Sequence, residues 1–575
     1  MTGFAWLLVP LAPCVGLVLL RWQDRVIPWL WLSCVPALLL ACWPAQPSSF
    51  SLLWPGTRWG ADDLMARGFL GFSALLWGCA TIFAAVSERS HPRRQKFWLF
   101  WLLSLSGNLL LVIAQDAASF YVGFSVMSLA AYGLVVHLGG PGPRQAGRVY
   151  LQLAVLGEML LYAGIMLRIH EAGGAIGAGN WGVDDWSFID WGFDHWQSVP
   201  IGGLTAILLL LGFGLKAGFW PLHVWLPLAH PAAPAAASAV LSGAMIKAGI
   251  LGIWRFTPVA DAGLQSWAIA VFAIAMFSVF YGALMGVIQT RAKAALAYSS
   301  VSQVGFLLAI VALAWLQPGA REAWAIVLVL YTVHHGLAKG ALFLGAGLSS
   351  HYAMRRMHWL LLALPALALA GLPFTSGAAV KLLLKDGIAA TPLVHWLPLL
   401  SLGSVATGLV VARALWLMYQ TQCQLRQDAA SRRKPPPGML YPWLLLSTTP
   451  LLLAVLLPAM RSLLPASLEL DKLWALLWPI LLTAGVVIVA LRRGWRLPAR
   501  LTHLPNPARH VSLRLKRLLL RPPVPDIDPV FDLGAWRRRE RRWNRFWQQG
   551  TVAVSVWLIC AALLASLLVG WLVAR

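Results

Sequence analysis

The chain has 575 residues, of which 59% are hydrophobic and only 11% are charged, a composition that places it among polytopic membrane proteins. Its net charge of +24 lies in the loops between apolar runs, as in the cytoplasmic loops of membrane proteins, so we expect no nucleic-acid partner. The six cysteines are scattered and form no CxxC pair, which gives no indication of an iron–sulfur or zinc site.

The apolar runs predict an all-α membrane protein with about 16 transmembrane helices. The expected spans are 3–20, 26–44, 67–86, 97–114, 117–138, 148–168, 201–219, 235–256, 265–289, 296–316, 322–348, 358–388, 397–419, 441–459, 473–492 and 552–573.

Two of these regions predict broken helices. Four prolines lie between residues 221 and 234, where the chain passes from one apolar run to the next. The run 358–388 is too long for one straight helix and contains Gly371-Leu372-Pro373. Irregular backbone at membrane depth is tolerated only where protein or a water-filled cavity satisfies its polar groups. Breaks here indicate a route for ions or protons.

Charge asymmetry predicts the orientation. Most of the 45 lysine and arginine residues lie in loops that follow odd-numbered spans. We expect a multi-pass protein of the bacterial inner membrane, and the positive-inside rule predicts that both termini lie on its outer, periplasmic side.

The basic segment 494–550 is unusual because leucine, tryptophan and phenylalanine alternate with arginine in it. We expect a lateral amphipathic helix that contacts the lipid bilayer or a neighbouring subunit. The alternative is an ordinary basic cytoplasmic loop. Residues 551–575 hold the last transmembrane helix.

Five of the ten lysines lie inside predicted spans: Lys216, Lys247, Lys339, Lys381 and Lys385. A charge at the bilayer centre costs roughly 2.5–3.5 kcal/mol, so such residues are usually functional. A lysine whose charged form is disfavoured by burial and favoured by a nearby carboxylate can load and release a proton. The alternative is that these lysines pair statically with carbonyl groups or extend to the interface.

Histidines accompany these lysines, and their imidazoles titrate near neutral pH. His223 follows the first break, and His334 and His335 share a predicted span with Lys339. Because His335 and Lys339 are four residues apart, they lie on one face of a helix. For His230 we expect an ordinary hydrogen-bonded histidine.

Glu158 is the only carboxylate that lies clearly in the middle of a span. It is a candidate counter-charge for Lys216, or it is simply hydrogen-bonded to a neighbouring helix. The hydroxyl-rich segment from Ser299 to Gln303 is suited to holding water inside the bundle, although serines also pack well between membrane helices.

Four segments together resemble the antiporter-like membrane subunits of respiratory complex I, of membrane-bound energy-converting hydrogenases (hydrogenase-4 component B type) and of Mrp antiporters. They are KAGFWPLHVWLPLAHPAAPAAASAVLSGAMIKAGILG, AKAALAYSSVSQVGF, HHGLAKGALFLGAG and GLPFTSGAAVKLLLK. The resemblance implies two inverted five-helix repeats with broken helices. It gives N-terminal spans at 1–95, repeats at 96–257 and 258–420, and C-terminal spans at 421–493.

The resemblance also implies roles for single residues. Lys216 is similar to the proton-loading lysine, Lys247 to the connecting lysine, His335 and Lys339 to the central pair, and Lys381 to the terminal group. The family usually has a glutamate in its fifth helix, where this chain has Ser125 within Phe124-Ser-Val-Met-Ser128. Either Glu158 has taken that role, or this chain pumps differently or not at all.

The sequence thus predicts a proton-translocating subunit of a redox-driven, NADH:quinone oxidoreductase-like or hydrogenase-like complex. The expected relay comprises Glu158, Lys216, His223, Lys247, His334, His335, Lys339, Lys381 and Lys385. We expect no cofactor in this chain, with redox cofactors and quinone in partner membrane and peripheral subunits. The alternatives are a Na⁺/H⁺ antiporter, an inorganic-carbon-uptake subunit and a non-pumping scaffold.

Overall fold

The computed structural model describes residues 5–22, 24–43, 45–50, 57–172, 192–258, 261–427 and 433–494. These residues belong to one compact unit. The expected last span and the basic segment, apart from its first residue, lie outside the described residues.

In the first half of the described chain, the regular elements are helices and one short antiparallel strand pair, which joins Ser48 to Trp59 and Ser49 to Arg58. Its elements are α1 (Ala5–Trp22), η2 (Asp24–Cys34), α2 (Val35–Cys42), β1 (Ser48–Ser49), β2 (Arg58–Trp59), α3 (Leu64–Ser87), α4 (Arg94–Ile113), α5 (Ala117–Val135), α6 (Pro141–Glu171), α7 (Phe193–Ser198), α8 (Gly203–Ala217), α9 (Leu226–Ala232), α10 (Ala235–Val240), the π-helix η4 (Leu241–Met245) and α11 (Lys247–Phe256).

The second half is built from longer helices. Its elements are α12 (Ala262–Val287), α13 (Ala292–Leu316), η5 (Pro318–Ala320), α14 (Arg321–His351), α15 (Arg356–Ala370), α16 (Ser376–Ala389), η6 (Val394–Trp396), α17 (Leu397–Gln427), α18 (Pro437–Leu456), α19 (Pro458–Arg461), α20 (Leu463–Ala466) and α21 (Leu470–Arg492).

Twelve of the described helical segments are long and apolar enough to cross a membrane. Three shorter apolar helices, α1, α8 and α15, accompany them. The structure is therefore that of an all-α, multi-pass membrane protein, as the sequence predicts. The main differences from the expected spans are at helix ends. For example, α6 begins at Pro141 rather than at 148, because proline is preorganised for the first helical position.

Both expected helix breaks are present. Helix α8 ends at Gly218, whose φ of 76° is left-handed, and regular helix resumes only at Leu226. Helix α15 ends in the same way at Gly371, with a φ of 102°, and α16 begins at Ser376. Glycine is suited to this C-terminal position because it has no Cβ to oppose a left-handed backbone.

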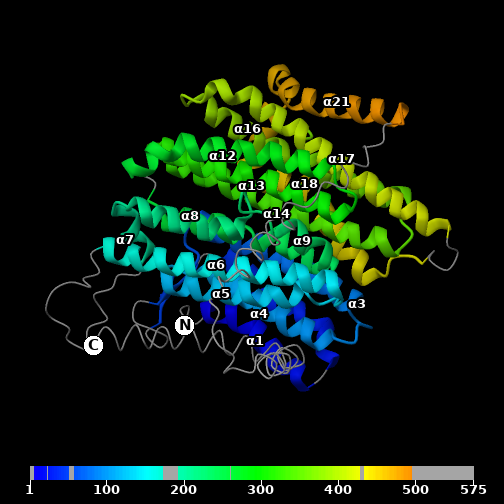
Figure 1. Cartoon of the computed structure of the whole chain (residues 1–575), viewed down its shortest axis with the longest axis horizontal. Coiled ribbons are helices and arrows are strands. Elements are labelled where there is room, and N and C mark those ends of the chain that lie inside the picture. The colour runs from blue at the N-terminus through cyan, green and yellow to red at the C-terminus, as the bar shows by residue number, and fades with distance from the viewer. Residues whose placement is uncertain are drawn as a thin grey trace, which may run out of the picture. The chain divides into compact units, whose positions relative to one another are not determined.

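The interior is formed by α14 and by the α10–η4–α11 segment, which is buried along its whole length. Helix α14 packs against α3, α10, α13, α16 and α18. Helices α4, α5, α6 and α8 lie side by side in that order (Figure 1). Helix α21, by contrast, is mostly exposed, as expected for a helix that faces lipid or a partner. Both broken helices thus join a protein-enclosed core.

Candidate functional site

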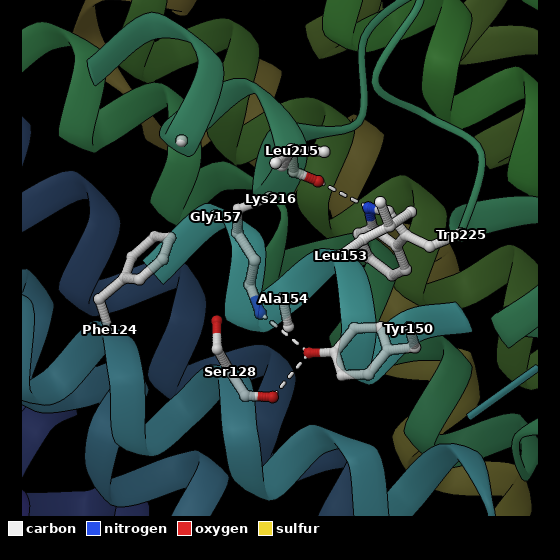
Figure 2. A pocket seen from close by; sticks show the side chains of 10 residues that line it. Phe124, Ser128, Tyr150, Leu153, Ala154, Gly157, Leu215, Lys216 and Trp225 are labelled. Atoms are coloured by element: carbon white, nitrogen blue, oxygen red, sulfur yellow. Dashed lines mark hydrogen bonds between the residues drawn. The ribbon is translucent and has the colours of Figure 1, made fainter. Parts of the chain in front are cut away.

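Lys216 lies in the last turn of α8, and its side chain points into a small cavity (Figure 2). Its Nζ donates to the Tyr150 hydroxyl at 3.3 Å, and that hydroxyl donates to the Ser128 carbonyl oxygen at 2.7 Å. The Phe124 ring centroid lies 5.9 Å from the same Nζ. The cavity has a volume of about 20 Å³, which is room for one water molecule. The break after α8 therefore leaves a buried ammonium group beside hydratable space.

Glu158 lies on α6 and is buried, with 5% of its surface exposed. Its Oε2 accepts a hydrogen bond of 2.5 Å from the Ser125 hydroxyl on α5. Its other oxygen, Oε1, has no hydrogen-bond partner among the described residues. Glu158 and Lys216 attract each other electrostatically without a direct bond. The carboxylate from α6 thus contacts the α5 position at which the family resemblance places a glutamate.

Lys247 begins α11 directly after the π-helix η4. A π-helical turn shifts its hydrogen bonds by one residue and thereby changes which carbonyl groups are available to side chains. The Lys247 ammonium donates to the Ser242 carbonyl oxygen inside that turn. The Ser242 hydroxyl in turn contacts the Ser300 hydroxyl of α13 at 2.7 Å.

Lys339 and His335 lie one turn apart on α14, and both are fully buried. The Lys339 Nζ donates to the Leu296 carbonyl oxygen at 2.9 Å, and the Ser300 hydroxyl donates to the same oxygen at 3.1 Å. Contacts with Ser242, Ser300 and the Leu296 carbonyl oxygen therefore link Lys247 to Lys339, although the two backbone carbonyl oxygens among them only accept hydrogen bonds. The two ring nitrogens of His335 have no protein partner in the described part of the chain.

The next group of polar side chains lies at the second break. His334 Nδ1 is 2.8 Å from the Ser376 hydroxyl at the start of α16. The Lys381 Nζ donates to the Ala370 carbonyl oxygen at 2.8 Å and to the Ser404 hydroxyl at 2.9 Å. Ala370 is the last residue of α15, so the break leaves its carbonyl oxygen without a helical partner and able to accept from Lys381.

Lys385 lies one turn beyond Lys381 on α16 and is only half-buried. Its Nζ donates to the Ala475 carbonyl oxygen of α21 at 3.0 Å. Electrostatic repulsion acts between Lys381 and Lys385. The arrangement therefore carries the polar series from α16 to the exposed helix α21.

His223 lies in the irregular turn between α8 and α9, apart from these contacts. Its ring lies 5.0 Å from that of Tyr281 and 6.0 Å from that of Tyr298. Its Nδ1 has no hydrogen-bond partner among the residues the structure describes. Nothing in this geometry joins His223 directly to Lys216.

Several functional groups were missed by the sequence analysis. Tyr150 and Ser404 hold lysines but lie in other helices, and nothing in their local sequence indicates this. His230 was expected to be hydrogen-bonded, but both ring nitrogens lack protein partners within the described ranges. Its ring stacks on Phe343 at 4.6 Å.

The hydroxyl-rich segment of α13 from Ser299 to Gln303 is fully buried. Gln303 donates to the Thr407 hydroxyl at 2.9 Å and accepts from the Tyr331 hydroxyl at 3.0 Å. The hydroxyls of Ser299 and Ser302 have no partner among described residues. Buried polar groups of this kind commonly bind water. In the described ranges, no group of three histidine, cysteine or acidic residues could hold a metal ion.

Chemically, the series consists of titratable side chains that alternate with carbonyl and hydroxyl groups. Backbone carbonyl oxygens accept from Lys247, Lys339, Lys381 and Lys385. Neutral acceptors stabilise an ammonium group less than a carboxylate does. The lysine and histidine side chains can each bind or release a proton, whereas the carbonyl oxygens between them only accept hydrogen bonds.

Comparison with known proteins identifies the family. The model of the transmembrane domain of NADH:quinone oxidoreductase and Mrp antiporter subunits matches residues 114–409, which is about half of the chain. The chain belongs to this family of antiporter-like membrane subunits.

Two curated relatives and one solved structure are similar to this chain. Hydrogenase-4 component B of Escherichia coli (strain K12) is 32% identical over 298 residues, which are 50% of this chain and 42% of that protein. The putative antiporter subunit mnhA2 of Staphylococcus saprophyticus is 31% identical over 351 residues, which are 56% of this chain and 42% of that protein. The chain thus spans less than half the length of these two relatives.

The solved structure is a subunit of the Mrp complex from Dietzia sp. DQ12-45-1b. It superimposes with a TM-score of 0.62 at 19% sequence identity and covers 82% of this chain and 98% of that subunit. At this identity, the likeness supports a shared fold.

Proposed function

We propose that this chain is the proton-translocating, antiporter-like membrane subunit of a redox-driven multisubunit complex. The observation that carries the proposal is the buried series Glu158–Lys216, Lys247–Lys339 and His334–Lys381. A protein without ion transport gains nothing from so many ionisable groups in an apolar interior. The complex would be of the NADH:quinone oxidoreductase or hydrogenase type, with its redox cofactors and quinone in partner subunits.

In this proposal, electron transfer in a partner subunit changes the electrostatic balance between Glu158 and Lys216. Lys216 then releases or loads a proton, and the changed charge acts on Lys247. The contacts through Ser242 and Ser300 extend the response to Lys339 and His335. Lys381 and Lys385 complete the route to the outer side. Each charge moved against 100 mV requires about 2.3 kcal/mol.

The finer architecture belongs to the same proposal. We infer about 16 spans, two inverted five-helix repeats at 96–257 and 258–420, and both termini on the periplasmic side of a bacterial inner membrane. The two breaks support this inference because each follows a helix that ends at a left-handed glycine. Inverted repeats with broken helices near the midplane are common among transporters.

The test is proton translocation by the purified complex in proteoliposomes, comparing wild type with Lys216→Ala and Glu158→Gln. Both variants should lose most translocation while the complex still assembles on a native gel. Lys472→Ala is the matched control, because Lys472 lies half-exposed in the first turn of α21 and, among the described residues, forms an ion pair with Glu469 alone, at 3.1 Å. If Lys216→Ala translocates protons normally, the lysines are structural and the chain is a scaffold.

A Na⁺/H⁺ antiporter subunit is the second candidate, because one relative is named as an antiporter subunit and the fold matches the Mrp complex. A requirement for Na⁺ on one side of the membrane, with no requirement for an electron donor, would favour this candidate. Absence of a Na⁺ requirement would favour the redox-driven subunit.

A further inference from the structure

A second polar cluster lies outside the relay, at the membrane side predicted to be cytoplasmic. Glu88 caps the C-terminal end of α3, and its Oε2 lies 3.1 Å from Nε2 of His137, just after α5. Both side chains are buried. The His137 ring lies 4.1 Å from the ring of His91, in the loop between α3 and α4. His91 also lines an open hollow formed by residues 89 to 96. The cluster therefore connects the surface to a buried carboxylate.

His91 is suited to exchange protons with water. Burial and the neighbouring His137 lower its pKa below the ordinary value, and Arg93 acts in the same direction, whereas Glu88 opposes them. These effects favour the neutral imidazole, which binds a proton only briefly and releases it readily.

Lys293 continues this cluster inward. It lies in the first turn of α13 and is attracted electrostatically by Glu88. Its Nζ donates to the Ala233 carbonyl oxygen at 2.8 Å. Ala233 follows α9 directly, so this bond fixes Lys293 against the end of the first broken helix.

His230 lies in the last turn of α9, three residues before Ala233, and is fully buried. Its two ring nitrogens lack protein partners among the described residues, although the Ser238 hydroxyl donates to its carbonyl oxygen at 3.0 Å. Lys293, Lys247 and Lys339 all act on it electrostatically. Burying an imidazole without hydrogen-bond partners destabilises the fold, and a phenylalanine would stack on Phe343 without this cost. The presence of a histidine here therefore indicates a function. His230 therefore lies between the surface cluster and the central lysines.

We propose that His91, His137, Glu88, Lys293 and His230 form the proton-uptake branch that supplies the central pair of Lys247 and Lys339. Protons pass from the hollow at residues 89 to 96 to the Glu88 carboxylate, and then past Lys293 to His230. Water bound at the free imidazole nitrogens completes the transfer to Lys339. The inference rests on the proposed function and adds to it the path by which protons arrive.

The experiment measures electrogenic proton translocation by the reconstituted complex with a potential-sensitive dye. The test variants are Glu88→Gln, Lys293→Met and His230→Ala, each compared with a surface residue of the same type: the exposed Glu469→Gln and His395→Ala and the half-exposed Lys472→Met. Each test variant should slow translocation roughly ten-fold or more, as expected for loss of a positioned proton-transfer group. The controls should match wild type.

Chemical rescue separates proton delivery from structure. Formate, a small weak acid, should restore translocation in Glu88→Gln and His230→Ala but not in Lys339→Met, which interrupts the relay itself. Formate dissipates a pH gradient but not a membrane potential, so the dye still reports translocation. If His230→Ala fails to assemble, His230→Gln keeps the size and polarity without the titration and decides the question.

The outcomes distinguish the two proposals. Normal rates in Glu88→Gln and His230→Ala, together with loss in Lys339→Met, would overturn the uptake branch and leave the proposed function intact. Loss in the test variants without rescue by formate would also overturn it. Normal rates in every variant, including Lys339→Met, would overturn the proposed function.

Discussion

At the scale of single residues, the contact between Ser125 and Glu158 explains how this chain differs from the family pattern. The hydroxyl on α5 donates to the carboxylate on α6 at 2.5 Å. The carboxyl group therefore lies beside the α5 position at which the resemblance implies a glutamate, although it originates from the next helix. Glu158 stays close enough to Lys216 to attract it.

This contact predicts that the two positions can exchange roles. Glu158→Gln should abolish translocation, and the double variant Ser125→Glu with Glu158→Gln should recover a substantial part of it, because the carboxylate returns to α5. Ser125→Ala alone removes the hydrogen bond to the Glu158 carboxylate. It should destabilise that carboxylate by about 1.5–3 kcal/mol, the usual contribution of a hydrogen bond to a charged group, and so slow translocation. Proton translocation in proteoliposomes measures all three.

Ser104→Ala is the matched control, since this buried hydroxyl on α4 has no partner among the described residues. Its activity should equal that of wild type. A double variant that is no more active than Glu158→Gln would contradict the exchange.

At the scale of elements, the second break depends on Gly371. Its φ of 102° is strained for other residues, and a Cβ there would lie 3.0 Å from Cδ of Lys381. Gly371→Ala should therefore destabilise the end of α15 by about 1–3 kcal/mol and displace the Ala370 carbonyl from Lys381. We expect slower proton translocation by a complex that still assembles.

Gly485→Ala provides the comparison, because a Cβ at this position of α21 would meet no atom within 4 Å. The unfolding temperature in detergent should not fall in this control, and should rise slightly if anything, because alanine favours a helix interior over glycine. Translocation rates should be unchanged. Equal behaviour of the two alanine variants would show that the break does not need glycine.

The helices and their breaks were predictable from the sequence, whereas the contacts between helices were not. Apolar runs predicted the helices, and Gly371-Leu372-Pro373 predicted a break, because both signals are local. The spacing of His335 and Lys339 also predicted their shared face. The partners of the lysines were not predictable, because Tyr150 or Ser404 meets its lysine only through the rotation and crossing of distant helices. The same reason applies to His230, since its sequence neighbours do not reveal a ring without protein partners.

At the scale of the whole molecule, Arg255 links α11 to the C-terminal end of α4, two helices that are distant in sequence. It lies in the last turn of α11 and donates to the carbonyl oxygens of Leu111 at 3.0 Å and of Val112 and Ala114 at 2.8 Å. These three carbonyls belong to the C-terminal end of α4, where no helical partner is available. One buried guanidinium thus satisfies the end of a helix that is distant in sequence.

Arg255→Met should lower the stability of the protein by about 3 kcal/mol, because three buried carbonyl groups lose their donor. Thermal unfolding of the purified protein in detergent measures the loss. Arg356→Met, at an exposed position of α15, should leave the midpoint unchanged. An unchanged midpoint in Arg255→Met would mean that water replaces the guanidinium.

The carbonyl acceptors of the buried lysines have a consequence for how such a protein changes during evolution. Lys247, Lys339, Lys381 and Lys385 donate to the backbone of Ser242, Leu296, Ala370 and Ala475. A mutation at any of these four partners alters a side chain but leaves the acceptor oxygen where it was. Selection on these contacts therefore acts on the lysines and on backbone geometry. The partner positions at Leu296, Ala370 and Ala475 are free to drift to other residues that fit, whereas Ser242 is also held by the contact of its hydroxyl with Ser300.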